Sequence, residues 1–187
     1  MLLDDLKKFD WLNEPENVRF DEAGMRVVAK CRTDFWNCVR YDFIKDDGHF
    51  FFCYAVDDFC CDLNWEFEKA ELFDQCGIML RIDENNWFKA SVMYENEEVP
   101  MLATSMTTNG LSDLATVPLP VGIKRVWYRL KRYKGCYIAS YSLDGENYVQ
   151  MRKFYLLYDT DEVKVGAYIC SPQHEDFEAV LRGVEMS

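Results

Sequence analysis

The run Phe59 to Phe67, FCCDLNWEF, constrains the fold more than any other stretch of the chain. Apolar residues occupy every second position of this run, and mostly polar residues lie between them. Successive side chains of a β-strand point to opposite faces of its sheet, so a period of two predicts a strand with one strongly buried face. An amphipathic helix would need an apolar period near 3.6, which this run lacks.

Strand-like runs of this kind recur along the whole chain. We expect roughly ten to twelve short strands separated by turn signals, with no sustained helical period between them. This pattern favours antiparallel sheets over an alternating α/β arrangement. The 13 Phe, 11 Tyr and 5 Trp supply bulky side chains to fill the space between two sheets. The sequence therefore predicts an all-β fold, a sandwich of two antiparallel sheets, as a single domain over residues 1–187.

Charge and composition exclude several classes of partner. The chain has 33 Asp and Glu against 21 Lys and Arg, a formal net charge of -12. This average field repels nucleic acid and anionic membranes, so neither is expected as a partner. The opening MLLDDLKKFDWL is typical of neither a signal peptide nor a membrane span, because charges interrupt it at once. The eight cysteines form no C-x-x-C pair, so we interpret them mostly as reduced thiols in the core. We expect a cytoplasmic protein and predict no cofactor.

A β-hairpin is predicted in the middle of the chain. Two strand-like runs, Gly77 to Asp83 and Trp87 to Tyr94, are joined by the turn-prone segment Glu84-Asn85-Asn86. Side chains that share a face of such a hairpin are brought together in cross-strand pairs. We therefore expect one face of this hairpin to present a compact row of side chains.

The side chains of that face suggest a recognition surface. An exposed aromatic ring suits the apolar side of a pyranose, and charged groups direct hydrogen bonds to its hydroxyls. The competing interpretation is a structural cluster of ion pairs that holds the hairpin and a neighbouring loop, since alternating charges are common on the outer face of a sheet. The sequence leaves both interpretations open. The candidate ligand-binding residues are Arg81, Asp83, Trp87, Lys89, Ser112 and Asp113.

Short segments spread over almost the whole chain resemble the DUF1349 family. The matching segments, in family order, are Trp11 to Pro15, Thr33 to Trp36, Asp47 to Phe51, Asp74 to Gly77, Arg81 to Asp83, Asn86 to Ala90, Asn109 to Asp113, Tyr141 to Gly145 and Cys170 to Pro172. The resemblance implies a fold similar to concanavalin A-like lectins and glucanases, a jelly roll of two antiparallel sheets. It also suggests a regulatory role, because a member of the family is linked to the regulation of enolase.

The chain departs from the family pattern at two positions. Met93 stands where the family usually carries an acidic residue, shortly after the segment Asn86 to Ala90. Leu114 stands where a tryptophan often follows the Ser-Asp pair. If either position contacts a ligand, we expect this chain to differ from its relatives in what it binds.

The polar positions Asp62, Asn64 and Glu66 resemble an acidic strand motif of laminarinase-type glycosidases. A retaining glycosidase needs two carboxyl groups about 5 Å apart. Positions four residues apart on a regular strand are separated by about 13 Å at their backbones, and an asparagine stands in the centre of the motif here. A solvated strand face is therefore the favoured interpretation.

Other catalytic and metal sites find little support. The two histidines, His49 and His174, lie in no recognisable nucleophile motif and have no clustered cysteine or carboxylate partner. His49 adjoins three phenylalanines and is interpreted as a structural histidine. The turn carboxylates at Asp57-Asp58 and from Asp159 to Glu162 are candidate calcium ligands, although paired acids in turns are usually solvated. We therefore predict no catalytic residue and no metal site.

These observations lead to three functional hypotheses. The first is a non-catalytic lectin-like domain that binds a carbohydrate or related polar ligand on one sheet face. The second is a protein-interaction or regulatory module that acts on a metabolic enzyme such as enolase, and the third is a glycoside hydrolase. The expected partner is therefore a carbohydrate or a metabolic enzyme, and the sequence does not specify the oligomeric state.

Overall fold

The computed structural model describes residues 6–38, 43–68, 71–96 and 98–187, which form seventeen β-strands. No helix in this described part of the chain is long and apolar enough to cross a membrane. The strands are β1 Asp10–Leu12, β2 Asn17–Asp21, β3 Gly24–Ala29, β4 Phe35–Cys38, β5 Phe43–Asp46, β6 His49–Val56, β7 Phe59–Phe67, β8 Gln75–Asp83, β9 Asn86–Tyr94, β10 Pro100–Thr108, β11 Leu111–Ser112, β12 Ala115–Pro118, β13 Arg125–Tyr133, β14 Cys136–Ser142, β15 Val149–Phe154, β16 Glu162–Cys170 and β17 Phe177–Met186.

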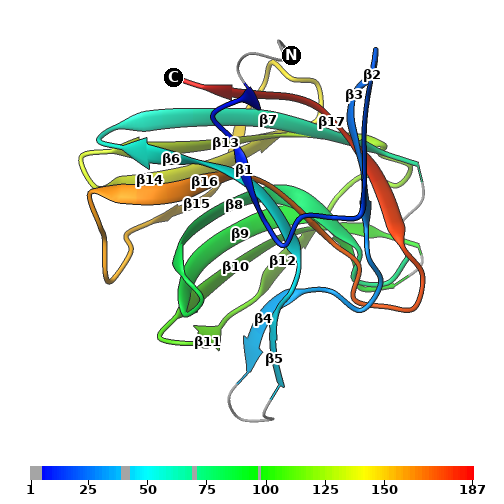
Figure 1. Ribbon diagram of the computed structural model, residues 1–187, viewed down its shortest axis with the longest axis horizontal. Coiled ribbons are helices and arrows are strands. Elements are labelled where there is room, and N and C mark those ends of the chain that lie inside the picture. The colour runs from blue at the N-terminus through cyan, green and yellow to red at the C-terminus, as the bar shows by residue number, and fades with distance from the viewer. Residues whose placement is uncertain (1–5, 39–42, 69–70, 97) are drawn as a thin grey trace.

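The strands form two sheets packed face to face (Figure 1). Sheet A has ten strands in the order β1-β6-β16-β8-β9-β10-β11-β4-β5, with β12 also paired to β10. Sheet B has seven strands in the order β15-β14-β13-β7-β17-β3-β2. The neighbours at the centre of each sheet are antiparallel. The predicted sandwich of two antiparallel sheets is therefore confirmed.

The alternation that predicted β7 matches its burial. The side chains of Phe59, Cys61, Leu63, Trp65 and Phe67 are each at most 8% exposed, whereas the residues between them are half-buried. The first set faces sheet A across the main core. Because the inner face is dry, its polar atoms need partners, and the indole nitrogen of Trp65 donates to the Gly77 carbonyl at 2.9 Å. Sheets A and B are thus joined by a hydrogen bond as well as by apolar contact.

A second, smaller core lies on the outer face of sheet A, the face turned away from sheet B. The β4–β5 hairpin folds back over this face, and Figure 1 shows it at one end of the molecule. The central strands β8 and β9 are therefore buried on both faces over most of their length. The buried residues of this second core are Phe35, Phe50, Phe52, Met79, Trp87, Tyr168 and Cys170.

The segment Thr33 to Asp47 supplies this cover. It contains β4 and β5, and β5 is the edge strand of sheet A. Tyr41, one of its aromatic residues, lies outside the described residues. The seventeen strands also exceed the ten to twelve expected, because strands such as β1, with 3 residues, and β11, with 2, are too short for an alternation to be recognised.

The cysteines behave as predicted. All eight are free, and five of them are buried. Burial raises the pKa of the Cys61 and Cys76 thiols well above the usual value, so these two stay protonated and pack as small apolar groups.

Candidate functional site

The predicted recognition face lies beneath the β4–β5 hairpin. Arg81 of β8 is paired in register with Trp87 of β9, and Met79 is paired with Lys89, so these side chains share the outer face of sheet A. The guanidinium of Arg81 binds Asp46 of the hairpin through two parallel hydrogen bonds, Nη1 to Oδ1 at 2.6 Å and Nη2 to Oδ2 at 2.8 Å. Arg81 is only 5% exposed. Its charge is therefore engaged inside the protein.

Lys89 also contacts the hairpin segment. Its ammonium lies 3.1 Å from Asp34 Oδ1 and donates to the Phe35 carbonyl at 2.6 Å. The same ammonium lies 5.6 Å from the ring centres of both Trp87 and Tyr168. Lys89 thus balances a carboxylate and is held between two aromatic rings.

Trp87 offers no face to a ligand. Its side chain is 1% exposed, and its ring centre lies 6.5 Å from that of Phe35 in an edge-to-face arrangement. The indole nitrogen of Trp87 has no hydrogen-bond partner within the described part of the chain. The predicted stacking of a sugar on Trp87 would require the β4–β5 hairpin to move away.

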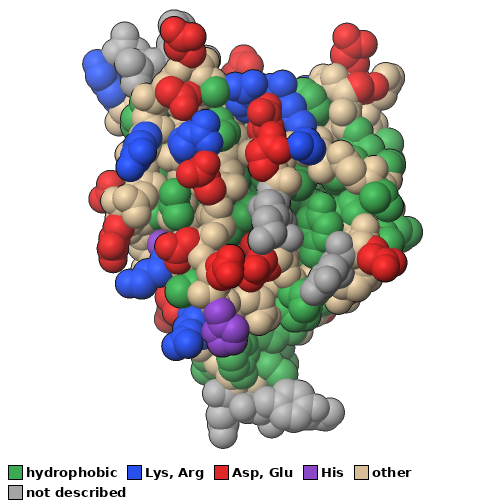
Figure 2. Space-filling model, turned by 90° about the vertical axis from the view of Figure 1, so that its right-hand side faces the viewer, with side chains coloured by type: hydrophobic (Ala, Val, Ile, Leu, Met, Phe, Trp, Pro, Cys, Tyr) green, Lys and Arg blue, Asp and Glu red, His purple; other side chains and the backbone are tan. Residues whose placement is uncertain are grey.

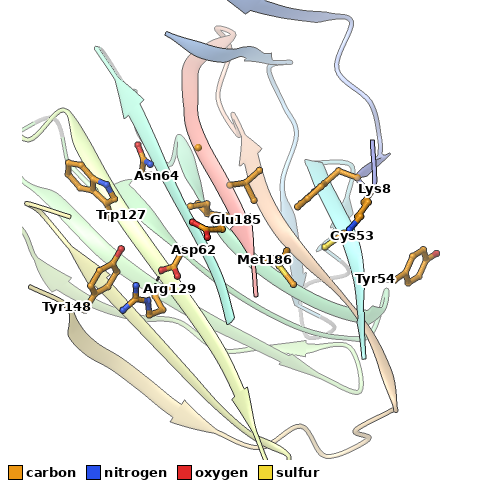
Figure 3. Close-up of a pocket in the computed structure, with 14 residues that line it drawn as sticks. Lys8, Cys53, Tyr54, Asp62, Asn64, Trp127, Arg129, Tyr148, Glu185 and Met186 are labelled. Carbon is orange, nitrogen blue, oxygen red and sulfur yellow. Dashed lines mark hydrogen bonds and ion pairs between the residues drawn. The ribbon is translucent and has the colours of Figure 1, made fainter. Parts of the chain in front are cut away.

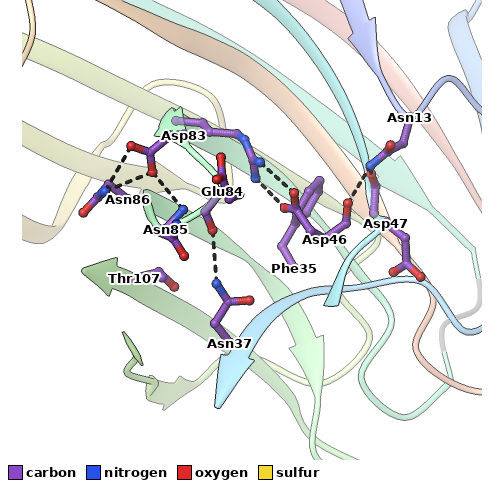
Figure 4. Close-up of polar contacts among 12 residues, drawn as sticks. Asn13, Phe35, Asn37, Asp46, Asp47, Asp83, Glu84, Asn85, Asn86 and Thr107 are labelled. Atoms are coloured by element: carbon purple, nitrogen blue, oxygen red, sulfur yellow. Dashed lines mark hydrogen bonds and ion pairs between the residues drawn. The ribbon is translucent and has the colours of Figure 1, made fainter. Parts of the chain in front are cut away.

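Asp83 does not share the face of Arg81, contrary to the prediction from strand parity. The register shifts between Arg81 and Asp83, so Asp83 is paired with Asn86 at the hairpin end. A bulge of this kind places two residues opposite one and cancels the alternation on which the prediction relied. The Asp83 carboxylate accepts from the Asn85 amide at 2.8 Å and from the Asn86 side chain at 2.9 Å, as Figure 4 shows. Asp83 therefore stabilises the turn.

Ser112 and Asp113 serve two different contacts. Ser112 Oγ accepts from the Asn37 amide of β4 at 2.9 Å and so helps to hold the hairpin. Asp113 accepts from the Met106 amide at 2.7 Å and pairs with Arg152 at 3.0 Å. Burial alone would raise the pKa of Asp113, but the Arg152 and Met106 hydrogen bonds outweigh it and hold this pKa below its usual range.

The structural interpretation therefore accounts for most of the predicted site. Arg81, Lys89 and Ser112 are three separate attachments of the segment 34–46 to sheet A. A fourth is visible in Figure 4, where the Asn37 side chain donates to the Glu84 carbonyl at 3.1 Å. Lys89, one of the six predicted residues, also lines a cavity.

That cavity, which we call the sheet A groove, lies beside the hairpin on the same face of sheet A. It encloses about 350 Å³. Strands β8, β9, β10 and β16 provide its floor, which is mainly polar. The floor residues are Gln75, Lys89, Ser91, Met93, Ala103, Ser105 and Tyr168.

The walls of the sheet A groove are mainly apolar and aromatic. Trp36 and Phe43 come from the β4–β5 hairpin, and Phe43 is 48% exposed. Phe73, Leu114 and Pro172 come from the connections around the groove. An apolar wall over a polar floor is the usual composition of a small-molecule site, and about 350 Å³ lies at the lower end of the size range for such sites.

Ser91 is one of the floor residues that the predicted set missed. Its hydroxyl is buried, at 1% exposure, and no group among the described residues donates a hydrogen bond to its oxygen. The hydroxyl of Tyr168 lies beside it, but donates to Gln75 Oε1 at 3.1 Å. The acceptor lone pairs of Ser91 Oγ therefore remain available. Strand parity could have found Ser91, because it follows Trp87 and Lys89 at every second position of β9.

Met93 and Leu114, the two positions expected to depart from the family pattern, both line this groove. Met93 lies on the floor and Leu114 on the wall. They come together only in the folded chain, since they belong to β9 and to the connection after β11.

A larger groove, of about 910 Å³, runs along sheet B and the end of β17 (Figure 3). Two of its aromatic rings are covered by arginines. The guanidinium of Arg125 lies 4.5 Å from the ring centre of Trp127, and that of Arg129 lies 4.0 Å from the ring centre of Tyr148. This groove therefore presents fewer free aromatic faces than its size suggests.

The motif Asp62, Asn64 and Glu66 belongs to the same surface. Asp62 accepts from Arg129 Nε at 2.6 Å, Asn64 Oδ1 accepts from Arg125, and Glu66 lies 3.0 Å from Arg182 Nε. A retaining glycosidase requires one carboxyl group free to transfer a proton and a second free to attack. In this ladder an arginine engages each member of the motif, so it supplies no such pair.

His49 has the contacts of a structural histidine. Its Nδ1 is bonded to the Asn13 carbonyl, and its Nε2 accepts from the Lys30 amide at 3.1 Å. Burial lowers the pKa of His49, and the nearby Lys30 lowers it further, whereas the Asn13 carbonyl and the acids Asp47 and Asp176 oppose the change. His49 is therefore held neutral. His174 is exposed in a loop.

Two of the candidate calcium ligands have protein partners. Asp58 accepts from the Lys134 amide at 2.7 Å, and Asp159 accepts from the Tyr137 hydroxyl at 2.7 Å and pairs with Arg132. Within residues 6–38, 43–68, 71–96 and 98–187, no three His, Cys, Asp or Glu side chains are grouped so as to hold a metal ion.

Comparison with known proteins identifies the family. Residues 11–187 match the model of a family of proteins of unknown function, DUF1349. The chain belongs to the DUF1349 family. A curated relative, "Regulation of enolase protein 1" of Saccharomyces cerevisiae, is 31% identical over 172 residues, which are 90% of this chain and 84% of the relative.

Solved structures agree on the fold. A crystal structure of a functionally unknown protein from Saccharomyces cerevisiae has a TM-score of 0.89 at 27% identity, and the match covers 97% of each chain. The carbohydrate-binding module CBM66 from Bacillus subtilis has a TM-score of 0.59 at 14% identity, covering 96% of this chain and 95% of the module. At that identity the second likeness shows a shared fold alone.

Proposed function

We propose that this DUF1349 domain is a non-catalytic, lectin-like protein that binds a carbohydrate in the sheet A groove. The observation that carries the proposal is the pairing of aromatic walls with the buried hydroxyl of Ser91 on the groove floor, to which no group among the described residues donates a hydrogen bond. A sugar presents both an apolar ring face and hydroxyl groups, so it complements both features. The carbohydrate-binding module with the same fold supports the proposal by analogy.

Because the Trp87 side chain is buried, the proposed site does not include it. The proposed stacking residue is Trp36 instead, because it lines the groove and is only half-buried. Lys89 is retained as a floor residue, whereas Arg81 and Asp83 stabilise the fold around it.

Calorimetric titration with methyl glycosides, simple disaccharides and soluble glucans tests the proposal. We expect at least one of these sugars to bind and the Trp36→Ala variant to weaken that binding at least about tenfold, since stacking on a large aromatic contributes at least about 1.4 kcal/mol. Trp127→Ala is the matched control, because Trp127 is also half-buried but lies on sheet B. No binding to any of these sugars, or equal losses in both variants, would refute the proposal.

A regulatory module that binds a metabolic enzyme is the second candidate, and the name of the relative with 31% identity favours it. Neighbouring strands of sheet A next to the groove expose apolar side chains, with Ile44 of β5 63% and Leu111 of β11 61% exposed. Figure 2 shows hydrophobic side chains gathered at the lower end of the molecule, around the β4–β5 hairpin. Scattered apolar residues are normal on surfaces, but adjoining ones are typical of protein contacts.

Sedimentation of the purified protein with purified enolase tests this candidate. We expect a complex that Ile44→Glu disrupts, because a charge at the centre of an apolar contact loses its hydration. Tyr54→Glu is the matched control, because Tyr54 is 57% exposed and lies on β6, away from the β4–β5 edge of the same sheet. Independent sedimentation of the two proteins would eliminate enolase as the partner.

A further inference from the structure

The charges that line the sheet A groove cancel. Asp34 and Lys89 are the charged residues among its described lining, and they form an ion pair of 3.1 Å. Their side chains are 16% and 5% exposed, so water screens this pair little. The ammonium of Lys89 also donates to the Phe35 carbonyl. The groove therefore has no uncompensated cation to offer an anionic ligand.

The remaining polar groups of the groove suit hydroxyl groups. Ser91 Oγ keeps its acceptor lone pairs, as described above. The contacts found for the Asp34 carboxylate within the described residues are all on Oδ1, which accepts from the Phe35 amide at 2.7 Å and from Lys89. Its second oxygen, Oδ2, is thus left as an acceptor. Both free acceptors would bind a hydroxyl donor and would repel a phosphate or carboxylate oxygen.

The surroundings of the groove act in the same direction. Met93 and Leu114 add apolar surface and no charge to the groove. The chain as a whole carries a formal net charge of -12, which opposes the approach of anions.

We propose that the sheet A groove selects uncharged sugars and discriminates against sugar phosphates and sugar acids, with Asp34 and Ser91 accepting hydrogen bonds from sugar hydroxyls. This proposal rests on the carbohydrate function proposed above and adds the charge class of the ligand. The Asp34–Lys89 ion pair is the source of the selectivity, because it neutralises the cation that an anionic sugar would need.

A paired ligand panel tests the selectivity. The probes are methyl glycosides of glucose, galactose and mannose, together with glucose 6-phosphate, mannose 6-phosphate, glucuronate and galacturonate, titrated calorimetrically at low salt. We expect a neutral glycoside to bind at least about tenfold more tightly than its charged counterpart, a difference of about 1.4 kcal/mol. Added salt should narrow the difference, because it screens the repulsion.

The possible failures separate the two proposals. Binding of no probe, together with no binding of the disaccharides and glucans titrated above, overturns the carbohydrate function, and the selectivity with it. A charged sugar that binds as tightly as its neutral counterpart, or more tightly, overturns the selectivity and leaves the carbohydrate function standing.

Two variants locate the selectivity in the groove. Asp34→Asn keeps the shape of the side chain but leaves the Lys89 charge uncompensated, so we expect the ratio of neutral to charged affinity to fall at least about tenfold. Because this substitution also weakens a buried ion pair, its fold is checked by circular dichroism. An unchanged ratio in folded Asp34→Asn overturns the role of the ion pair.

Ser91→Ala provides the test that does not depend on the ion pair. It removes a buried hydroxyl without a partner, so we expect an unchanged or higher melting temperature together with at least about fivefold weaker sugar binding. Ser142→Ala is a contrasting control. Ser142 of sheet B is equally buried, but its hydroxyl donates a hydrogen bond to Asp144 at 2.8 Å. Sugar binding that is unaffected by Ser91→Ala overturns the assignment of Ser91 as a ligand acceptor.

Discussion

The ion pair between Arg81 and Asp46 is the contact that best tests whether the outer face of the β8–β9 hairpin binds a ligand or stabilises the fold. Two parallel hydrogen bonds of 2.6 and 2.8 Å join a side chain that is 5% exposed to one that is 33% exposed. The guanidinium also lies 5.7 Å from the ring centre of Phe35. Removing Arg81 would therefore break an ion pair, a cation–aromatic contact and one attachment of the β4–β5 hairpin.

The magnitude follows from this geometry. Breaking a fully buried ion pair costs about 3–5 kcal/mol, chiefly because the remaining charge is left buried. Asp46 is one-third exposed and can regain water, so we expect Arg81→Met to cost about 2–3 kcal/mol. For a chain of this size, that loss lowers the melting temperature by about 4–12 °C.

Thermal and urea unfolding followed by circular dichroism measure the loss. Arg129→Met is the matched control, because Arg129 pairs with Asp62 at 2.6 Å but both side chains are about one-third exposed, 33% and 29%. Such an exposed pair contributes at most about 1 kcal/mol. A double-mutant cycle of Arg81→Met with Asp46→Asn should give a coupling free energy of about 1–3 kcal/mol. If Arg81→Met costs no more than Arg129→Met, Arg81 does not hold the hairpin, and a role in recognition becomes the better explanation.

Two further predictions concern the backbone and pH. Gly77→Ala should lower the free energy of unfolding by at least about 3 kcal/mol, because a Cβ there would lie 1.9 Å from the Ala90 carbonyl oxygen. Gly122→Ala, with φ of +82° and no atom within 4 Å, should lower it by only about 1–2 kcal/mol. Similar melting temperatures for the two variants would contradict this expectation. The pKa of His49 is lower in the folded protein than in the unfolded chain, so the unfolded chain binds a proton more readily. The contribution of neutral His49 to the free energy of unfolding is therefore complete above about pH 6.5 and is lost as the pH falls toward the lower pKa of the folded state. His49→Gln should flatten the decline in melting temperature below pH 6.5, and an equally steep decline would count against His49 as its source.

Local sequence patterns were enough to define the strands and the class of fold. The alternation in β7 and the two runs of the β8–β9 hairpin depend on which residues follow one another, and the structure confirms both. The bulge between Arg81 and Asp83 could not be predicted, because the same order of residues is compatible with a regular pairing and with a bulged one. A single extra residue then removed Asp83 from the predicted face.

Burial of the predicted site depended on contacts far apart in the chain. Parity correctly placed Arg81, Trp87 and Lys89 on one face of sheet A, but it carries no information about what covers that face. Asp46 is 35 residues from Arg81 and Asp34 is 55 residues from Lys89, so these pairings exist only once the β4–β5 hairpin has folded over the sheet. The open groove beside the hairpin was missed for the same reason.

The sequence by itself therefore determined that this chain is an antiparallel sandwich of the DUF1349 family, because strand alternation and family segments are local properties. Only the tertiary structure decided which polar residues are already engaged and which are free. Trp87 became part of a core, whereas Ser91, two strand positions beyond Lys89, became a buried hydroxyl at the floor of a groove. The physical reason is that exposure is set by the whole fold, and exposure determines whether a side chain stabilises the protein or can bind a ligand.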